Sequence, residues 1–241
     1  MVKTASCNEG MRDLLLEIYL RLLGRFGPRY WWPADTPFEM ITGAILTQNV
    51  SWKGAAQAVR NLKERGWLEP GCILRVPEEE LAEILRPARY HFQKAQKLKE
   101  FCRVLTEEYG GDLAAFLSQE TGSLRERLLR IRGIGPETAD CIILYAAGKP
   151  VFVIDAYTHR IFHRLGYFGE RAKYGEMQAF FMRHLPHDAR LFNEYHAQLD
   201  ALGHHICLKR APRCGDCPVL PFCREAALHS SVGQVNNAGS R

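Results

Sequence analysis

Residues 128–140 read Leu-Leu-Arg-Ile-Arg-Gly-Ile-Gly-Pro-Glu-Thr-Ala-Asp, a pattern that predicts a helix, a turn with two glycines and a second helix. Gly133 and Gly135 permit positive φ angles and the close approach of another backbone. Pro136 suits the first position of the second helix. Such a turn leaves backbone N–H groups that can bind a phosphate oxygen, but an ordinary helix cap would use the same glycines.

Helical periodicity also extends over most of the chain on both sides of this turn. Apolar residues recur every three or four positions, and Gly or Pro stands at nearly every junction. The run Val151-Phe-Val-Ile154 is β-branched but has no partner of similar character. We therefore expect an all-α fold, with helices over residues 15–26, 38–46, 51–65, 78–85, 95–105, 124–131, 136–147, 156–165 and 177–184.

The composition is that of a globular protein with one large domain or two small ones. Of the 241 residues, 46% are hydrophobic and 24% are charged, which excludes wholesale disorder and fibrous repeats. The chain contains no apolar run of about 18 residues, and residues 1–10 lack an apolar signal core. We expect a soluble intracellular protein without a membrane partner, and a polar, disordered tail over residues 226–241.

Positive charge is concentrated in two segments. The chain has 32 Lys and Arg against 27 Asp and Glu, a net charge of +5. Residues 86–99 hold five cations and no acid, and residues 124–132 hold four arginines and one acid. Both segments fit solvated helix faces, and both fit contact with a polyanion such as a nucleic acid. Charge alone does not decide between the two.

Four of the eight cysteines lie near the carboxyl end with the spacing Cys207-x6-Cys214-x2-Cys217-x5-Cys223. Four thiolates this close are unfavourable unless a metal neutralises them. Zinc is the usual metal for such a set. One Cys-x2-Cys pair flanked by two single cysteines also fits an iron–sulfur cluster enclosed by one loop. Basic residues, Arg213 among them, surround the motif.

The apolar run 151–154 ends abruptly in Asp155. A carboxylate at this point is either the N-cap of the next helix or a poorly solvated group held for catalysis. The two roles can coexist, because a capping carboxylate keeps a free lone pair and is fixed on a rigid element.

Together, the glycine turn, Asp155 and the cysteine spacing resemble the endonuclease III superfamily of helix-hairpin-helix DNA glycosylases, over about residues 12–224. The resemblance implies a six-helix barrel domain over residues 33–147 that carries the hairpin. It implies a second domain built from residues 1–32 and 148–225, with a [4Fe-4S] cluster held by Cys207, Cys214, Cys217 and Cys223. The implied partner is double-stranded DNA containing a damaged base. The protein would be a cytoplasmic monomer, associated with the nucleoid if the source is prokaryotic.

The resemblance also implies roles for single residues. Asp155 matches the catalytic aspartate, and Gln48 lies in the Thr-Gln-Asn segment that probes the gap left by a flipped nucleotide. The expected DNA contacts are Gln48, Gly133, Gly135, Arg160 and Arg213.

One position departs from the bifunctional members of that superfamily. They place a lysine two residues after the second glycine of the hairpin, where this chain has Glu137. A carboxylate cannot form a Schiff base with the sugar, so lyase chemistry should be absent. Glu137 is also simply a favourable charge in the first turn of a helix. The remaining branches are monofunctional and act on mispaired adenine, on mismatched uracil or thymine, or on 3-methyladenine.

Tryptophans favour the methyladenine branch. Tyr30-Trp-Trp-Pro33 and a Trp52 that closely follows the Thr-Gln-Asn segment look most like that branch. We expect Trp31, Trp32, Trp52 and Glu137 to form a pocket in which a flipped, cationic base stacks on aromatic faces, although large aromatics also serve as core. The predicted reaction is hydrolysis of the N-glycosidic bond of alkylated purines. The alternatives are a glycosylase for mismatched uracil, mismatched thymine or another damaged base, and a non-catalytic protein that binds DNA damage.

Overall fold

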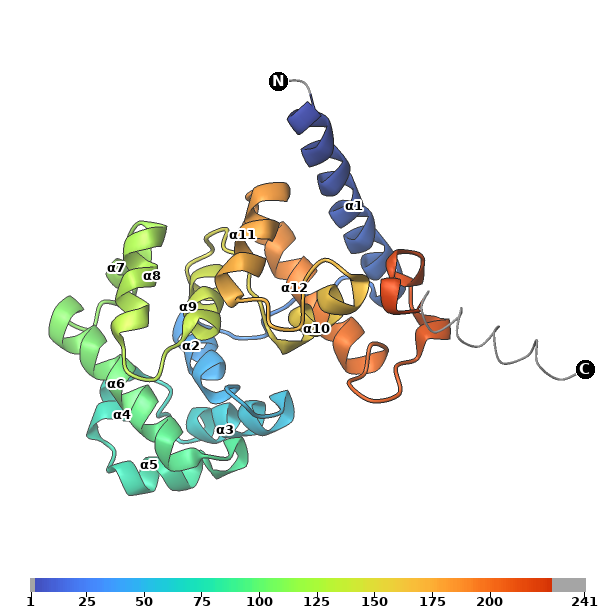
Figure 1. Cartoon of the computed structure of the whole chain (residues 1–241). Helices are drawn as coiled ribbons and strands as arrows, with labels where there is room; N and C mark the ends of the chain where they lie inside the picture. Colours follow the sequence, from blue (N-terminus) through green and yellow to red (C-terminus); the bar gives the residue numbers. More distant parts are fainter. Residues whose placement is uncertain (1–2, 227–241) are drawn as a thin grey trace, which may run out of the picture. The chain divides into compact units, whose positions relative to one another are not determined.

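The computed structural model describes residues 3–226, with side chains from residue 9 onward. Within this range every regular element is a helix, which confirms the all-α fold (Figure 1). The tail expected over residues 226–241 lies outside the described residues, apart from Ala226. The described chain divides into two compact units, which meet in sequence between Trp31 and Trp32 and between Val151 and Phe152. The sequence had placed these borders after residues 32 and 147.

The hairpin unit, residues 32–151, holds most of the helices. These are α2 (Pro37–Leu46), α3 (Trp52–Glu64), α4 (Pro70–Arg75), α5 (Glu78–Ile84), η1 (Arg86–Ala88), α6 (His91–Tyr109), α7 (Leu113–Ser118), α8 (Thr121–Arg130), α9 (Pro136–Cys141) and η2 (Ile142–Ala146). The short α4 and α7 were not predicted. The expected helix over residues 136–147 is divided into α9 and the π-helical turn η2.

Helix α2 forms the centre of the hairpin unit. Eight of its ten residues are buried, which is typical of a helix that is apolar on all sides. Its start is well defined, because Thr36 accepts a hydrogen bond from the Glu39 amide at 3.1 Å and Pro37 occupies the first turn. The elements α3, α6, α9 and η2 pack around it.

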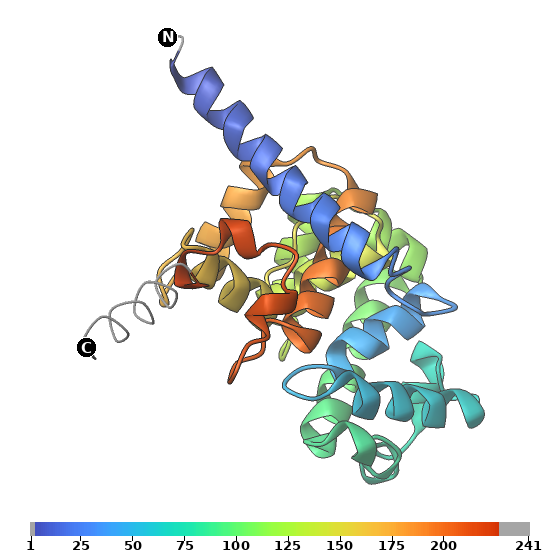
Figure 2. The ribbon, with the colours of Figure 1, turned by 90° about the vertical axis from the view of Figure 1, so that its right-hand side faces the viewer.

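The terminal unit combines the described residues up to Trp31 with those from Phe152 onward. It contains α1 (Lys3–Phe26), α10 (Ala156–Leu165), α11 (Tyr174–His184), α12 (Ala189–His205), η3 (Cys214–Asp216) and η4 (Leu220–Phe222). Helix α12 packs on α1 and α10. The segment that carries the four cysteines lies beside α1, and the Arg21 guanidinium of α1 stands 5.1 Å from the centre of the Phe222 ring (Figure 2).

Aromatic rings fill the core of the terminal unit. Phe152 stacks on Phe181 with ring centres 4.1 Å apart, and Phe192 and Tyr195 meet Phe152 edge to face. The β-branched run 151–154 is therefore an unpaired extended segment that buries its side chains in this core. Extended backbone here delivers the chain directly to the start of α10 at Asp155.

Helices α10 and α12 approach each other closely at Gly203. A Cβ atom on Gly203 would lie 2.5 Å from Cδ1 of Tyr157, so any other residue at this position would push the two helices apart. Helix α12 was not predicted, because three buried residues interrupt its apolar period: the polar His196 and Gln198, and Gly203, which has no side chain.

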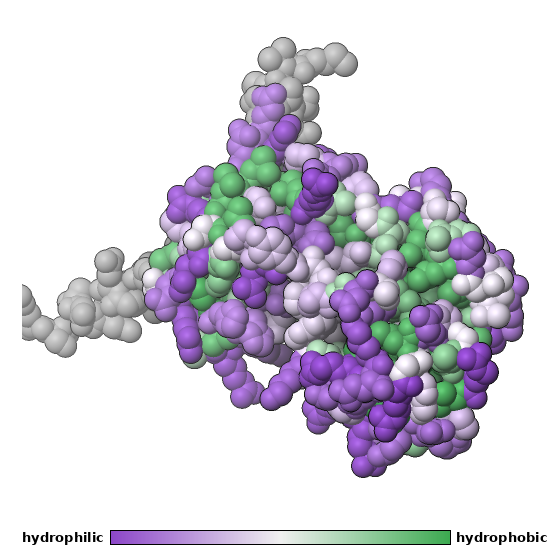
Figure 3. All heavy atoms as spheres, turned by 180° about the vertical axis from the view of Figure 1, so that it is seen from behind, coloured by the Kyte–Doolittle hydropathy of each residue, from purple (hydrophilic) through white to green (hydrophobic). Residues whose placement is uncertain are grey.

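No helix among residues 3–226 is both long enough and apolar enough to cross a membrane. On the face shown in Figure 3, hydrophilic residues cover much of the surface, and hydrophobic residues lie between them.

Candidate active site

The glycine turn connects α8 to α9 as the sequence predicts, but its two glycines differ. Gly133 has a φ of +92°, and a Cβ atom there would lie 2.5 Å from Cγ of Lys97, so both the backbone and the packing require glycine. Gly135 caps α9 with a φ of −95°, so it does not use the positive φ that glycine permits. A Cβ atom on Gly135 would meet nothing within 4 Å. The surface of the turn is thus open at Gly135 and filled at Gly133.

Gln48 lies against the hairpin. Its side-chain amide donates to the Gly133 carbonyl at 3.0 Å and to the Thr138 hydroxyl at 2.9 Å. Its carbonyl oxygen accepts a hydrogen bond from the Lys97 ammonium. These bonds fix both ends of the amide, so the expected probing residue is joined to the expected phosphate-binding turn.

Part of the basic segment 86–99 has a structural role. The Lys94 ammonium donates to the Leu46 carbonyl at the end of α2, and Lys94 is only 2% exposed. Burial, and next the nearby charge of Lys97, together lower the pKa of Lys94 to about 8. The Lys99 ammonium donates to three carbonyls at the end of α4, including those of Ile73 and Leu74. Lys94 and Lys99 therefore satisfy helix ends, a role that charge counting did not indicate.

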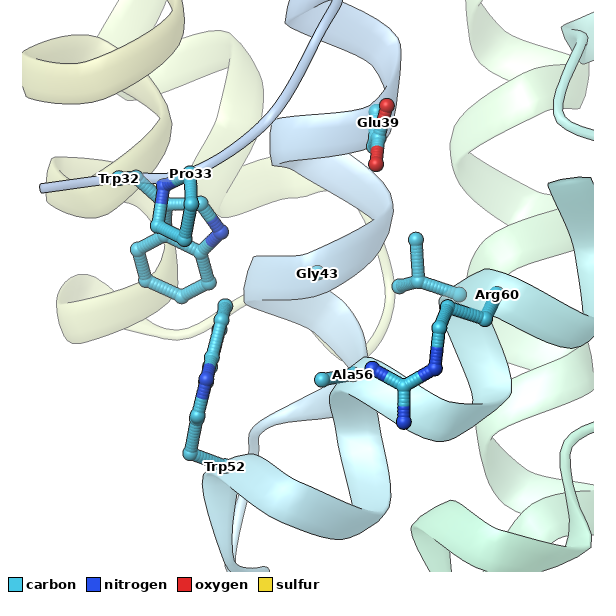
Figure 4. A pocket seen from close by; sticks show the side chains of 8 residues that line it. Trp32, Pro33, Glu39, Gly43, Trp52, Ala56 and Arg60 are labelled. Carbon is cyan, nitrogen blue, oxygen red and sulfur yellow. The ribbon is translucent and has the colours of Figure 1, made fainter.

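A cavity of about 250 Å³ opens between α2 and α3 (Figure 4). Trp32 and Trp52 meet edge to face on one side of it, with ring centres 4.9 Å apart and planes at 83°. Trp52 is 36% exposed, so this ring is not core. The other lining residues are Pro33, Glu39, Gly43, Ala56, Val59 and Arg60.

Only two of the four residues expected in the substrate pocket line this cavity. Trp31 belongs to the terminal unit, and Glu137 is exposed in the first turn of α9. Gly43 makes room for Trp32, since a Cβ atom at Gly43 would lie 3.2 Å from Nε1 of the indole. The carboxylate of Glu39 is 3.3 Å from the Lys63 ammonium, so the charged wall of the cavity is itself paired.

Asp155 is the N-cap of α10, as one of its two interpretations predicted. Its Oδ1 accepts a hydrogen bond of 2.7 Å from the Thr158 amide, and its Oδ2 lies 3.8 Å from Nε2 of His196. The Asp155 side chain is 15% exposed. The cap holds the carboxylate on a rigid helix while leaving Oδ2 directed at the imidazole, so the geometry is compatible with the catalytic interpretation as well.

Helix α12 places further ionisable groups near Asp155 that the sequence analysis missed. His196, Asp200 and His204 recur every four residues and so lie along one face of α12. The pKa of Asp200 is raised chiefly by burial and next by the negative charge of Asp155, whereas His196, His204 and Arg29 act in the opposite direction. The His-x3-Asp-x3-His spacing was a readable signal, but it has meaning only once α12 is known to be a helix.

Arg160 serves the interior of the terminal unit. Its guanidinium donates to the carbonyls of Cys207 at 2.9 Å and of Gly203 at 2.8 Å, at the end of α12. Arg213 is exposed immediately before Cys214. DNA contact by Arg160 and Arg213 stays a prediction, and the structure places only Arg213 with its side chain toward solvent.

The four cysteines of the carboxyl-terminal motif influence one another and form no disulfide. Burial first, and then the charges of Cys207, Cys223 and Cys214, raise the pKa of Cys217 to about 11. Burial also raises the pKa of Cys223. In the part of the chain that the structure describes, no three His, Cys, Asp or Glu residues are arranged so that they could hold one metal ion. The donor set itself, four thiols on one segment, fits a group that needs four thiolates.

The comparisons with known proteins agree with this architecture. The family model described as "HhH-GPD superfamily base excision DNA repair protein" matches residues 42–187, which include the hairpin and Asp155. A protein of Methanocaldococcus jannaschii named as a candidate DNA repair glycosylase is 43% identical over 216 residues, which cover 89% of this chain and 98% of that protein. The chain belongs to the HhH-GPD superfamily of base excision DNA repair proteins and is a DNA N-glycosylase.

Two solved structures share the fold of this chain. An endonuclease III trapped as a covalent intermediate with DNA has a TM-score of 0.79 at 22% identity, covering 91% of this chain and 98% of that one. The Helicobacter pylori 3-methyladenine DNA glycosylase bound to 1,N6-ethenoadenine has a TM-score of 0.67 at 27% identity, covering 81% of this chain and 96% of that one. With the family match and the 43% identical relative, the resemblance to the endonuclease III superfamily is confirmed, and the non-catalytic alternative is set aside.

The raised pKa of Asp200 predicts a pH-dependent effect on stability. When folding raises the pKa of a carboxyl group, the free energy of unfolding decreases as the pH rises from the ordinary pKa through the raised one. Asp200→Asn should therefore raise the melting temperature at neutral pH, and its advantage should shrink as the pH falls toward about 4, the ordinary pKa of Asp. Thermal unfolding across this range measures the effect, with Asp13→Asn, at an exposed position on α1, as the control. A variant less stable than the wild type at neutral pH would contradict the prediction.

Proposed function

We propose that this glycosylase removes alkylated purines such as 3-methyladenine from double-stranded DNA by hydrolysis, without lyase chemistry. The observation that carries the substrate class is the Trp32–Trp52 pair, which lines a cavity of about 250 Å³. Pockets for drug-sized ligands usually exceed roughly 300 Å³, so this cavity suits a single base. The likeness to the Helicobacter pylori 3-methyladenine glycosylase, at 27% identity, supports the same class.

Aromatic faces distinguish an alkylated purine from a neutral base. Alkylation at N3 or N7 makes the base cationic, and a cation is attracted to the face of an indole. The charged residues of the wall offer no unbalanced acid, because Glu39 is paired with Lys63 and the cation Arg60 also lines the cavity. Selection therefore depends on the Trp32 and Trp52 rings. A cationic base is also a good leaving group, since its departure neutralises it, so the enzyme needs recognition more than acid catalysis.

Asp155 carries the hydrolysis in this proposal. One of its oxygens is fixed by the Thr158 amide at 2.7 Å, so the carboxylate keeps its orientation while the second oxygen acts. That oxygen stabilises the positive charge that develops on the sugar and accepts a proton from the attacking water. No covalent step is expected, because the exposed Glu137 stands where bifunctional relatives have a lysine nucleophile.

DNA contact in this proposal depends on the open face of the hairpin and on the cysteine segment. Apart from Gly135 and its two chain neighbours, no described residue has an atom within 4 Å of the place that a Cβ atom on Gly135 would take. A phosphate can therefore approach the N–H groups at the start of α9. Arg213 supplies an exposed cation. Gln48 must exchange its bonds to the hairpin for bonds to DNA if it enters the gap left by a flipped base.

We further propose that Cys207, Cys214, Cys217 and Cys223 hold a [4Fe-4S] cluster. When bound, the cluster would supply iron–thiolate bonds that join four points of this segment. The thiols favour such a group, because neighbouring thiolates repel one another and raise one another's pKa. A positively charged metal centre would relieve this repulsion and stabilise the thiolates. Arg164 supports the same segment by donating to the Leu208 carbonyl at 2.7 Å.

Base release from defined duplexes tests the reaction. We expect 3-methyladenine, and also 7-methylguanine, to be released in preference to uracil, mismatched thymine or mispaired adenine. The product should be an intact abasic site that is cleaved only after alkali treatment. Asp155→Asn should abolish most release but keep affinity for abasic DNA, since phosphate contacts remain. The control is Asp112→Asn, which alters an N-cap carboxylate on α7 that accepts the Ala115 amide at 2.9 Å.

Two results would contradict this reaction. Trapping of a covalent protein–DNA adduct by borohydride at appreciable yield would show that an amine acts as nucleophile. Efficient release of uracil or mismatched thymine without methyladenine would place the enzyme in the mismatch branch instead.

The cavity assignment is tested by Trp52→Ala. Base–aromatic stacking contributes roughly 1–3 kcal/mol, so turnover on alkylated DNA should fall about tenfold to a hundredfold while the protein stays folded. Single-turnover rates and melting temperatures should be measured together. Trp67→Ala is the matched control, because Trp67 is a half-buried tryptophan of the hairpin unit outside the cavity. A lower melting temperature with an unchanged rate would show that Trp52 only packs.

The cluster is tested by metal analysis after anaerobic purification. We expect brown protein with about four iron and four sulfide per chain, as a [4Fe-4S] cluster requires. Cys217→Ser should lower the iron content, whereas Cys72→Ser, at a half-buried cysteine of α4, should not. Colourless protein with one equivalent of zinc would refute the assignment.

A further inference from the structure

The face of α12 that meets α10 carries a row of ionisable side chains. His196 and Asp200 lie one helical turn apart, and His196 is buried with its side chain 9% exposed. Asp155 on α10 places Oδ2 at 3.8 Å from Nε2 of His196, a distance within the range of an ion pair. Asp200 lies close enough to Asp155 for their charges to interact. The imidazole of His196 therefore stands among two carboxylates, one on each helix.

We infer that His196 is a positioning residue: its imidazole, on α12, holds the second oxygen of the Asp155 carboxylate in place. The inference rests on the role proposed for Asp155. With Thr158 binding one oxygen and His196 facing the other, the carboxylate is restrained from both sides.

The surroundings explain why Asp155 needs such a partner. The Asp155 side chain is only 15% exposed, so a protein group rather than bulk water must orient its second oxygen. The ionisable groups that face Asp200 are Asp155 and Tyr157 of α10, His196 and His204 of α12, and Arg29, which follows α1. Among these, His196 is the group that the structure places against Asp155 itself, at 3.8 Å.

His204 has a different task. Its Nδ1 lies 3.4 Å from the Tyr157 hydroxyl, and the Tyr157 ring packs on Gly203. Two histidines on the same face of one helix thus have separate contacts, one with the carboxylate and one with the tyrosine. A role in packing alone would not require an imidazole directed at Asp155.

Single-turnover kinetics test the inference. His196→Leu should lower the rate of base release at least tenfold with little change in the DNA concentration that gives half the maximal rate. His196→Gln should recover much of the loss, because its amide can present an N–H to the carboxylate. The control is His184→Gln, which removes a half-buried imidazole bonded to the Phe180 carbonyl on α11. Equal losses in all three variants, or a change confined to DNA affinity, would overturn the inference.

A double substitution separates positioning from a structural role. If His196 acts only through Asp155, His196→Leu should not slow the Asp155→Asn protein further, so the effects should be strongly non-additive. If His196 has an independent role, the two losses should multiply. A multiplied loss overturns the inference while leaving the role of Asp155 intact.

A stability cycle gives a result that does not depend on activity. The melting temperatures of the wild type, Asp155→Asn, His196→Leu and the double variant should show coupling between the two residues. Additive shifts would overturn the contact on which the inference rests. If instead the coupling is present but Asp155→Asn releases bases at the wild-type rate, the proposed catalytic role fails and the contact stands.

Discussion

The close approach of α10 and α12 at Gly203 is the constraint on which the candidate catalytic arrangement depends. Tyr157 occupies the space that any Cβ atom at position 203 would need, with a closest distance of 2.5 Å. Arg160 strengthens the same contact by binding the Gly203 and Cys207 carbonyls. This packing brings Asp155, at the start of α10, within 3.8 Å of His196 on α12. A residue larger than glycine would therefore disturb the carboxylate as well as the helix pair.

In the hairpin unit, lysines take the place of capping side chains. Lys94 binds the carbonyl at the end of α2, and Lys99 binds carbonyls at the end of α4. Lys97 packs its chain on Gly133 and donates to Gln48. Helix ends leave carbonyl groups without partners, so a cation there is favourable even when it is buried. The excess of positive charge on this segment thus serves the fold first, and it overstates the charge available to DNA.

Much of the fold could be predicted from sequence because its signals are local. The glycine turn, the bounds of α10 and the N-cap Asp155 depend on neighbouring residues, and each was found where expected. Helix α12 was missed because its buried face contains His196 and Gln198, which break the apolar period. Trp31 does not line the cavity that Trp32 and Trp52 line, and it lies in the other compact unit. Adjacent tryptophans can belong to different compact units, and spacing does not show where a chain crosses between them.

The difference between local signals and long-range packing explains why Asp155 could be identified from the sequence whereas its partners on α12 could not. A capping carboxylate is recognised from the residues beside it, whereas a partner forty residues away is defined only by the packing of two helices. His196 and Asp200 acquire their meaning from Gly203, which sets the distance between α10 and α12. Polar residues buried on a helix are costly unless a partner compensates them. On α12, His196 is the buried polar residue whose burial the contact with Asp155, at 3.8 Å, would compensate.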